Sequence, residues 1–375
     1  MKKHKAPKIA ISGYYGFDNC GDEAVLLAII HSLRKLIPDA KIVVFSANPK
    51  KTQALFGVKA VNRWNPVIMA LEILSCRLFI SGGGSLLQDA TGPRSVRYYL
   101  GTIRFALLFR KKTMIYSQGI GPLSNEKSRS TVAKVLSRCH AISVRDAHSA
   151  QLLEELGIRR DVHVACDPVM ALSADDAELT QIEVELGGLG ICASKSGGHK
   201  PLLLAAIRCW QDNRHVAHVA KLLDAQISRG WDVLLIPAHF PEDTEAMSKT
   251  ADAMEHQPYC LAKCLTAGQF IALTCRADLV FSMRLHGLIC AMAAGTPMLA
   301  LSYDPKVDAF MEQIGLNKYC LPFEGFDSSA AVPLLEELSL LPDRVVSAMQ
   351  ARRAELRTLA VDSAIIAARM LNVEC

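Results

Sequence analysis

Short apolar runs alternate with amphipathic stretches along most of the chain. Each run predicts a β-strand, and several runs are rich in Ile and Val. The stretch Glu23–Leu36 carries Val25, Ile29 and Leu33 at helical spacing, which predicts a helix between the first two strands. In the first half of the chain, we expect strands at Lys8–Ser12, Lys41–Ser46, Arg77–Ser81, Thr113–Ser117, Ala141–Val144 and His163–Ala165.

The pattern pauses in the acidic segment Ser173–Leu186 and then resumes. Alternating strands and helices predict βαβ units around a parallel sheet. We therefore predict an α/β fold of two doubly wound Rossmann-like domains, residues 1–180 and 181–341. A helical tail, residues 342–375, is expected to pack back on the first domain. The strands expected in the second domain are Leu189–Ala193, Val233–Pro237, Leu279–Ser282 and Met298–Ser302.

Composition supports two packed domains and divides them by charge. The 375 residues are 50% hydrophobic and 21% charged, which excludes a disordered chain and a coiled coil. Residues 1–180 hold 25 Lys and Arg against 15 Asp and Glu, whereas the remainder holds 17 against 22. A basic half joined to an acidic half predicts different binding partners for the two halves.

The sequence predicts a soluble cytoplasmic protein that is at most peripheral to a membrane. The apolar run after the basic N-terminus is too short for a signal peptide, and no run of apolar residues is long enough to span a bilayer. The 12 cysteines follow no disulfide or zinc spacing, so we expect reduced thiols and no metal. Aromatic residues make up only 6% of the chain and no reader motif occurs, so we expect no nucleic-acid partner.

Loops rich in glycine follow several of the predicted strands. After the first strand, Asp18 and Asn19 precede a helix whose first turn holds Asp22. Either Asp22 simply caps this helix, or all three side chains face a hydroxyl-rich ligand or supply a base. The triple glycine Gly82, Gly83 and Gly84 is expected at a strand-to-helix turn, and the segment around Gln118 at a similar turn after the next strand. Three such turns at one sheet edge predict a bound polar molecule, although tight packing alone is the alternative for the triple glycine.

A basic segment at residues 94–112 is the most suggestive surface of the first half. Arg94, Arg97 and Arg104 share one helical face and alternate with aromatic residues. Such a helix suits an anionic membrane surface or a phosphorylated ligand. The alternative is a solvated face over ordinary core residues.

In the second half, the candidate functional residues lie mainly after the predicted strand Leu279–Ser282. Arg284 offers a planar fork for a carboxylate or phosphate, and His286 can transfer a proton near neutral pH. On an extended segment, these two side chains project to the same side. Lys306, after the next strand, adds a positive charge at the same edge unless it is an ordinary surface lysine.

Taken in order, these motifs resemble the polysaccharide pyruvyl transferases, specifically their bacterial cell-wall type (CsaB). The resemblance covers nearly the whole chain, and the set of motifs is specific although each one alone is weak. It implies a fold like that of the GT-B glycosyltransferases. The motifs are Gly13…Asn19-x-Gly21-Asp22, Ser81–Gly84, Gln118–Pro122, Ser143–Asp146, Ser282-x-Arg284-x-His286-Gly287, Gly295–Pro297 and Tyr303-Asp304-x-Lys306.

The resemblance implies transfer of pyruvate from phosphoenolpyruvate to a sugar as a cyclic ketal. For the cell-wall type, it implies a 4,6-linked ketal on N-acetylmannosamine of a lipid-linked precursor at the cytoplasmic face of the membrane. Polymers modified in this way bind S-layer homology domains. Phosphoenolpyruvate is then a co-substrate, and no cofactor or metal is expected.

The chemistry of this reaction suggests roles for individual residues. We expect His286 to be the general acid beside Arg284, with Asp18 or Asp22 as the base. Leu285 and Lys306 are also expected to contact the donor. The resemblance further implies an arginine after the first strand of the second domain. At that place the sequence shows Lys195, which can hold a phosphate but lacks the fork of an arginine. The expected acceptor contacts are Asn19, Gly82, Gly83, Gly84, Gln118, Arg94, Arg97 and Arg104.

Two other functions fit the same sequence. A GT-B glycosyltransferase would share the fold but consume a nucleotide sugar. A non-enzymatic adaptor would dock on anionic membranes through residues 94–112 and leave phosphoenolpyruvate unchanged.

Overall fold

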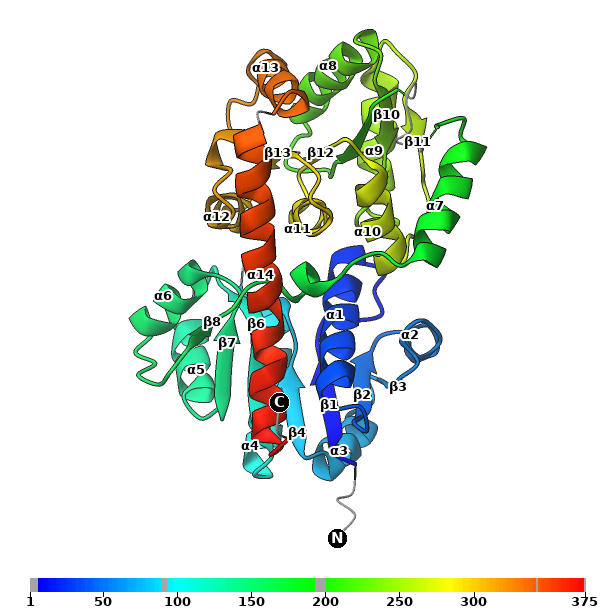
Figure 1. Cartoon of the computed structure of the whole chain (residues 1–375). Helices are drawn as coiled ribbons and strands as arrows, with labels where there is room; N and C mark the ends of the chain where they lie inside the picture. Colours follow the sequence, from blue (N-terminus) through cyan, green and yellow to red (C-terminus); the bar gives the residue numbers. More distant parts are fainter. Residues whose placement is uncertain (1–5, 90–92, 193–199, 342, 374–375) are drawn as a thin grey trace. The chain divides into compact units, whose positions relative to one another are not determined.

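The computed structural model describes residues 6–89, 93–192, 200–341 and 343–373, and the chain divides into two compact units. The first unit comprises Met1–Phe17, Asp22–Ala171 and Leu356–Cys375. The second comprises Asp18–Gly21 and Leu172–Glu355, so a short early segment belongs with the later part of the chain. Figure 1 labels helices and strands of both units and colours them by residue number.

The first unit contains an eight-stranded parallel sheet in the order β3-β2-β1-β4-β6-β7-β8, with β5 paired to β6. The strand order reverses between β1 and β4, and ligands of doubly wound sheets bind at the carboxyl ends of such strands. The strands are β1 (Lys8–Ser12), β2 (Lys41–Ser46), β3 (Lys59–Asn62), β4 (Leu78–Ser81), β5 (Gly84–Leu87), β6 (Lys112–Ile120), β7 (Ala141–Val144) and β8 (His163–Val164).

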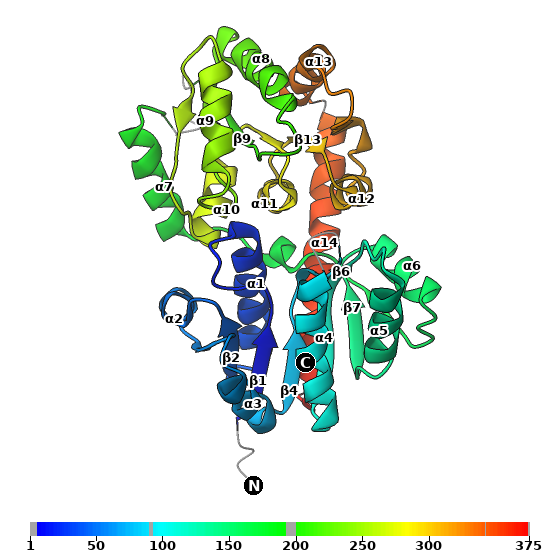
Figure 2. The same cartoon turned by 180° about the vertical axis from the view of Figure 1, so that it is seen from behind.

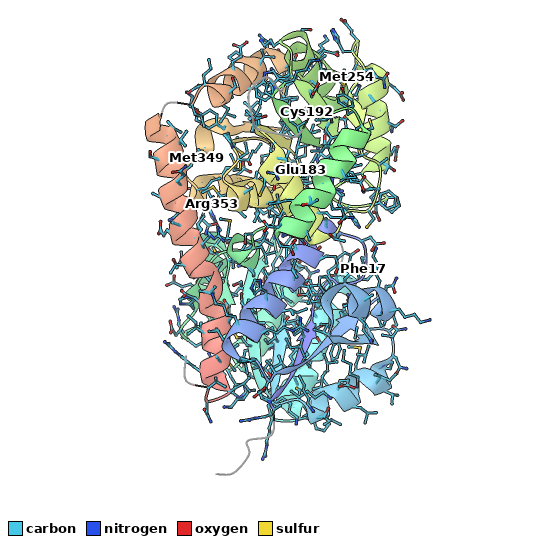
Figure 3. The ribbon with its side chains drawn as sticks, turned by 45° about the vertical axis from the view of Figure 1, so that its right-hand side comes forward. Phe17, Glu183, Cys192, Met254, Met349 and Arg353 are labelled. Atoms are coloured by element: carbon cyan, nitrogen blue, oxygen red, sulfur yellow. The ribbon has the colours of Figure 1, made fainter. Side chains whose placement is uncertain are left out.

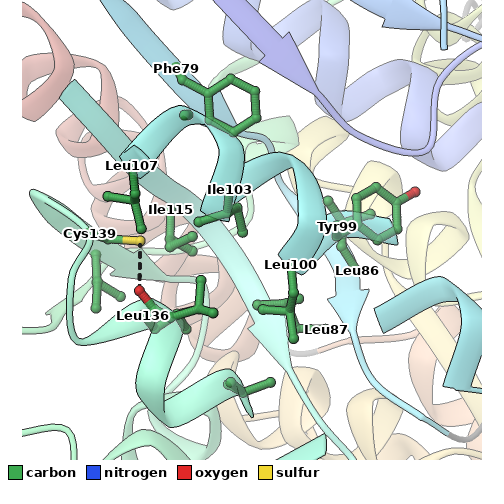
Figure 4. Close-up of a cluster of buried hydrophobic side chains, with 14 of the residues drawn as sticks. Phe79, Leu86, Leu87, Tyr99, Leu100, Ile103, Leu107, Ile115, Leu136 and Cys139 are labelled. Atoms are coloured by element: carbon green, nitrogen blue, oxygen red, sulfur yellow. Dashed lines mark hydrogen bonds between the residues drawn. The ribbon is translucent and has the colours of Figure 1, made fainter. Parts of the chain in front are cut away.

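Helices of the first unit bury their apolar faces against this sheet. Tyr99 and Ile103 of α4 pack with Phe79 of β4 and Ile115 of β6 in one buried cluster (Figure 4). The helices are α1 (Cys20–Leu36), whose first two residues belong to the second unit, α2 (Pro49–Phe56), α3 (Pro66–Ser75), α4 (Pro93–Leu108), α5 (Glu126–Leu136) and α6 (Ala147–Glu155).

The second unit contains a six-stranded parallel sheet in the order β11-β10-β9-β12-β13-β14. Here the order reverses between β9 and β12, whose adjacent carboxyl ends are the place where a ligand is expected. The strands are β9 (Leu202–Ala206), β10 (Asp232–Leu235), β11 (Tyr259–Cys260), β12 (Leu279–Ser282), β13 (Met298–Ser302) and β14 (Cys320–Pro322).

Within the described residues, seven helices connect or flank these strands. The view from behind shows α8, α9 and α11 near these strands (Figure 2). They are α7 (Asp176–Gly188), α8 (His215–Ser228), α9 (Thr244–Ala253), α10 (Ala267–Arg276), α11 (Leu285–Ala294), α12 (Pro305–Gln313) and α13 (Ser328–Ser339).

The long helix α14 (Asp343–Met370) contributes to both units. In the second unit, Nε of Arg353 donates to the carbonyl of Ala293 at 2.8 Å, and Figure 3 labels this arginine. In the first unit, the hydroxyl of Ser363 bonds those of Ser117 and Ser143, each at 2.8 Å. The end of α14 therefore packs on the first sheet, as predicted for the C-terminal tail.

The predicted fold class, two doubly wound α/β units, is confirmed, but one predicted strand is wrong. Residues 189–192 follow α7 without forming a strand, and the first strand of the second sheet is β9. The residue that follows this strand at the position where the resemblance implies an arginine is Arg208. Lys195 lies outside the described residues.

Two of the predicted glycine turns are also wrong. The triple glycine does not lead from a strand into a helix, because Gly84 already begins β5. Gln118 lies inside β6, which continues to Ile120. The glycine loop after β1 is the one that joins a strand to a helix as predicted.

Other predicted features concern thiols, metals and membranes. Eleven cysteines lie within the described residues, and all are free thiols. Burial raises the pKa of Cys76 to about 11 and that of Cys139 to about 12, so neither is a nucleophile at neutral pH. The described part of the chain contains no cluster of His, Cys, Asp or Glu suited to a metal ion. Among its helices, none combines the length and apolarity that crossing a bilayer requires.

The position of β9 gives a stability prediction. Leu204 in the centre of β9 is fully buried, so Leu204→Ala should lower the free energy of unfolding by about 2–5 kcal/mol. Leu189→Ala, in the segment first expected to be the strand, should cost less than about 1 kcal/mol. Urea denaturation followed by circular dichroism measures both variants, and equal losses would contradict the corrected strand.

Candidate functional site

Two arginines follow the adjacent strands at which the second sheet reverses its strand order. Ala206 at the end of β9 is in register with Ser282 at the end of β12. The amide of Met283 then donates to the carbonyl of Ala206 at 3.0 Å. Arg208 and Arg284 are each the second residue beyond this pair, so both lie at the carboxyl edge of adjacent strands.

Arg208 is held by aromatic and neutral groups. Its Nη1 donates to the hydroxyl of Tyr303 at 2.7 Å, and its guanidinium lies 5.0 Å from the ring of Trp210 and 4.7 Å from that of Tyr303. Tyr303 follows β13, so the side chain of Arg208 reaches across the end of β12. Among the described residues, no carboxylate lies within salt-bridge distance of Arg208, and its positive charge stays available to an anion.

Arg284, by contrast, is paired with a buried carboxylate. Its Nε donates to both oxygens of Asp243, at 3.1 and 3.0 Å, and its Nη2 contacts the same group. Asp243 is only 1% exposed and also accepts from the amides of Ala238 and His239. The side of the Arg284 guanidinium formed by Nε and Nη2, which we expected to bind a ligand, is therefore occupied by Asp243. Among the described residues, none forms a hydrogen bond with Nη1.

The helix α11 begins directly after Arg284, so the predicted extended segment from Arg284 to His286 is wrong. The hydroxyl of Ser282 accepts from the amide of Arg284 at 3.0 Å and donates to its carbonyl at 2.8 Å. His286 thus lies half-buried in the first turn of the helix. The buried Leu285 can offer a ligand only its backbone, whose N–H lies at the positive end of the helix dipole.

The segment Asp18–Gly21 completes this part of the second unit. Asn19 forms an antiparallel bridge with His239, and the amide of Cys20 donates to the carbonyl of Ala238 at 3.0 Å. A Cβ on Gly21 would lie 2.1 Å from Nδ1 of His286, so only glycine fits against this imidazole. The structure therefore brings Asn19 and the neighbouring Asp18 into the unit that holds His286.

Asn19 and Asp22 have identifiable structural contacts. The side-chain oxygen of Asn19 accepts from the amide of Gly21 at 3.1 Å, which caps the start of α1. Asp22 lies half-buried in the first turn of α1 and belongs to the first unit. One of its carboxylate oxygens is 2.8 Å from the place that a Cβ would take on Gly84.

Lys306 lies in the first turn of α12, after the carboxyl end of β13. Its ammonium group pairs with Asp304 at 2.9 Å, and its side chain is 35% exposed. Asp304 also caps α12 by accepting from the backbone amide of Lys306 at 3.1 Å. The positive charge of this lysine is therefore already compensated within the protein.

Close packing accounts for the triple glycine in the first unit. A Cβ on Gly82 would lie 2.2 Å from the hydroxyl of Tyr15, and one on Gly83 would lie 2.7 Å from Val25. Tyr15 is fully buried, and this burial, followed by the charge of Asp22, raises its pKa well above the usual range. These glycines fit the packing alternative, since each faces a neighbouring side chain.

Gln118 is buried rather than open to a ligand. It has no exposed surface, and its Nε2 donates to the hydroxyl of Ser81 at 2.7 Å and to the carbonyl of Gly82 at 2.6 Å. The side chain expected to touch the acceptor therefore holds the link between β4 and β5 in place.

Two of the three arginines of α4 meet in one cavity. Arg97 and Arg104 are exposed and line a cavity of about 360 Å³ together with Lys127 of α5. The aromatic residues that alternate with them face the core, where Tyr99 is 2% exposed. Arg94 is part of α4, but its side chain lies outside the described residues. This surface is therefore basic without being aromatic.

Sequence reasoning missed Arg208 and Asp243. Arg208 was hidden by the misplaced first strand, although the uninterrupted apolar run Leu202–Ile207 is a signal that could have located it. Asp243 lies in a loop far from Arg284 in the sequence, and no local pattern indicates that the two residues pair.

Comparisons with known proteins add a family and a fold. The family model described as "Polysaccharide pyruvyl transferase" matches residues 19–305. The amylovoran biosynthesis protein AmsJ of Erwinia amylovora is 24% identical over 367 residues, which cover 82% of this chain and 86% of that protein.

Among solved structures, similarity is confined to the fold. The UDP-GlcNAc 2-epimerase of Neisseria meningitidis has a TM-score of 0.65 at 13% identity, with 97% of this chain and 100% of that chain covered. The MnaA–UDP structure from S. aureus has a TM-score of 0.67 at 13% identity, with 98% of each chain covered.

The buried ion pair yields a prediction. Asp243→Ala leaves Arg284 without its carboxylate and should lower the free energy of unfolding by about 3 kcal/mol. Arg284→Ala leaves a buried carboxylate and should cost a similar amount. The double variant should be more stable than the sum of the two single losses predicts, by about 1–3 kcal/mol. Denaturant titration measures all three variants, and strictly additive losses would show that the pair is not coupled.

Proposed function

Because the chain belongs to the polysaccharide pyruvyl transferase family, we propose that it transfers pyruvate from phosphoenolpyruvate to a sugar as a cyclic ketal. Family membership makes the protein a transferase of polysaccharide biosynthesis. The identity of the donor, the identity of the acceptor and the type of bond formed go beyond family membership and are proposed here. Its single strongest support is the placement of Arg208 and Arg284 at the ends of β9 and β12.

The donor requires several fixed positive groups because it carries both a carboxylate and a phosphate. Arg208 supplies a guanidinium at the sheet edge that no carboxylate among the described residues compensates. Arg284 adds Nη1, and the first turn of α11 adds backbone N–H groups. In this proposal Lys306 and Lys195 are secondary contacts, since Lys306 is already paired with Asp304.

Ketal formation needs a proton on the methylene carbon of phosphoenolpyruvate. His286 donates this proton, which turns the methylene into a methyl group and makes C2 cationic. One sugar hydroxyl adds to C2, and a second hydroxyl closes the ring as the C–O bond to phosphate breaks. The carboxylate base relays the two hydroxyl protons: one restores His286 and the other leaves with phosphate, so atoms and charge balance.

A carboxylate near His286 would accept the hydroxyl proton during attack. Asp18 is the better supported candidate because its segment packs in the same unit as His286. Asp22 remains the alternative, two residues beyond Cys20 in the same helix. The scheme requires no metal and no cofactor.

The proposed acceptor is N-acetylmannosamine of a lipid-linked cell-wall precursor, modified as a 4,6-ketal at the cytoplasmic face of the membrane. The charge of the first 180 residues, 25 basic against 15 acidic side chains, supports an anionic acceptor on that side. The cavity lined by Arg97, Arg104 and Lys127 is the proposed place for its pyrophosphate.

One assay separates this proposal from a glycosyltransferase. The protein is incubated with phosphoenolpyruvate and a lipid-pyrophosphate disaccharide that contains the amino sugar, and phosphate release and acceptor mass are measured. We expect phosphate release in step with a pyruvylated acceptor. Consumption of a nucleotide sugar, with phosphoenolpyruvate unchanged, would contradict the proposal.

Three variants test the roles in the donor site. His286→Ala should lower kcat by about 10²–10⁴-fold, as expected for loss of a general acid. Arg208→Gln should raise KM for phosphoenolpyruvate by about 10-fold or more, because a hydrogen bond to a charged group is lost. Arg214→Gln, at an exposed arginine of the same unit, is the matched control and should behave as wild type. Wild-type turnover in folded His286→Ala would exclude this residue as the acid.

A further inference from the structure

Helix α3 of the first unit is apolar on its outer face as well as on its inner one. Met69 and Ile73 point into the core and are 6% and 2% exposed. On the opposite face, Val67 is 66% exposed, Leu71 is 60% exposed and Leu74 is 40% exposed. A helix that is apolar all round is ordinarily buried, so this outer face indicates a missing partner.

The apolar surface continues onto the neighbouring helix α4. The ring of Trp64, which is 63% exposed, lies 6.1 Å from that of Tyr98 on α4. At the other end of α3, Nζ of Lys111 donates to the carbonyl of Leu74 at 2.6 Å. Beside this lysine lie the exposed Leu108 and Phe109 at the end of α4. We call the set Trp64, Val67, Leu71, Leu74, Leu108 and Phe109 the α3 face.

The α3 face carries positive charge and no exposed negative charge. Glu72 is the only acidic residue in residues 63–77, and it is 7% exposed on the inner side of α3. Burial raises its pKa, but hydrogen bonds from Lys59 and Lys8 outweigh this effect and keep the pKa below its usual value. Residues 104–112 contain no acid at all, while Arg77 and Arg110 are exposed beside the face.

We propose that the α3 face docks on an anionic lipid bilayer. Aliphatic side chains bordered by cations match a bilayer whose headgroups are negative, and an exposed tryptophan suits the interface between headgroups and acyl chains. A second copy of this face would bring its arginines and lysines against those of the first, so charge favours lipid over a symmetric dimer. This docking surface therefore shares only Leu108 and Phe109 with residues 94–112, the segment that the sequence suggested for membrane docking, and it excludes Arg94, Arg97 and Arg104.

The α3 face begins at the same sheet edge as the glycine loop after β1. Arg63, directly before Trp64, is 4% exposed and donates to the carbonyl of Gly13 at 2.8 Å. Its guanidinium lies over the rings of Trp64 and Phe17, each at 5.1 Å. A bilayer on this face would therefore lie next to the loop that leads to Asp18. Delivery of a lipid-linked acceptor there rests on the proposed function, whereas the docking itself does not.

Vesicle sedimentation tests the docking without substrates. Wild-type protein should co-sediment with phosphatidylcholine vesicles that contain phosphatidylglycerol, and less with phosphatidylcholine alone. The variant Val67→Gln/Leu71→Gln/Leu74→Gln should reduce binding by about 10-fold or more, since three exposed apolar side chains are lost. The matched control, Val184→Gln/Leu340→Gln, alters side chains that are 71% and 80% exposed in the second unit and should bind as wild type.

Each contrary outcome overturns the docking proposal. The proposal fails if wild-type protein does not bind the anionic vesicles, or if the α3 variant binds them as well as wild type does. It also fails if wild-type protein binds neutral and anionic vesicles equally. Self-association that the α3 variant abolishes, without vesicle binding, would assign the face to a second copy of the chain. Unchanged thermal unfolding of the variant shows that it is folded. Loss of vesicle binding with intact phosphate release on a soluble acceptor would separate docking from the proposed transfer.

Discussion

The ion pair between Arg284 and Asp243 is the interaction on which the candidate site depends. It joins the loop after β10 to the loop after β12, and the same carboxylate holds the amides of Ala238 and His239. The segment around Asn19 then pairs with that loop. Buried ion pairs contribute little to stability compared with apolar packing. The main effect of this ion pair is therefore to position the residues around it. It fixes the start of α11, and with it His286, relative to the neighbouring strands.

The ion pair with Asp243 also gives Arg284 a different role from Arg208. Asp243 compensates the charge of Arg284, which can therefore orient an anion through Nη1 but attracts it weakly. Arg208 lies against the rings of Trp210 and Tyr303, and within the described part of the chain no carboxylate pairs with it. A unit that is acidic overall can hold a small dianion in this way, because a local guanidinium and a helix N-terminus outweigh screened surface carboxylates. The first unit is basic and carries the apolar α3 face, which suits the proposed anionic bilayer rather than a small soluble anion.

The sequence predicted the architecture well because buried parallel strands are continuous apolar runs. Several strands, such as Lys8–Ser12 and Met298–Ser302, begin and end as expected. The prediction failed at β9, whose Leu and Ala residues suit a helix as well as a strand. That error concealed Arg208, although the resemblance implied an arginine after this strand.

Other parts of the site were beyond reach because they depend on long-range packing. The pairing of Asp243 with Arg284 and the contact of Gly21 with His286 join segments far apart in the sequence. The glycines around Gly83 suggested a ligand, but they are explained by neighbouring side chains. The sequence pattern predicts which residue types lie at a sheet edge. Only the three-dimensional structure shows which of these residues already bind another side chain of the protein.

The central claim is that the donor binds in the second unit, at the carboxyl ends of β9 and β12. A crystal structure of the protein with phosphoenolpyruvate tests it most directly. The account predicts density for the donor beside Arg208 and Nη1 of Arg284, at the start of α11. Density at the glycine loops of the first unit instead, with this edge empty, would contradict it.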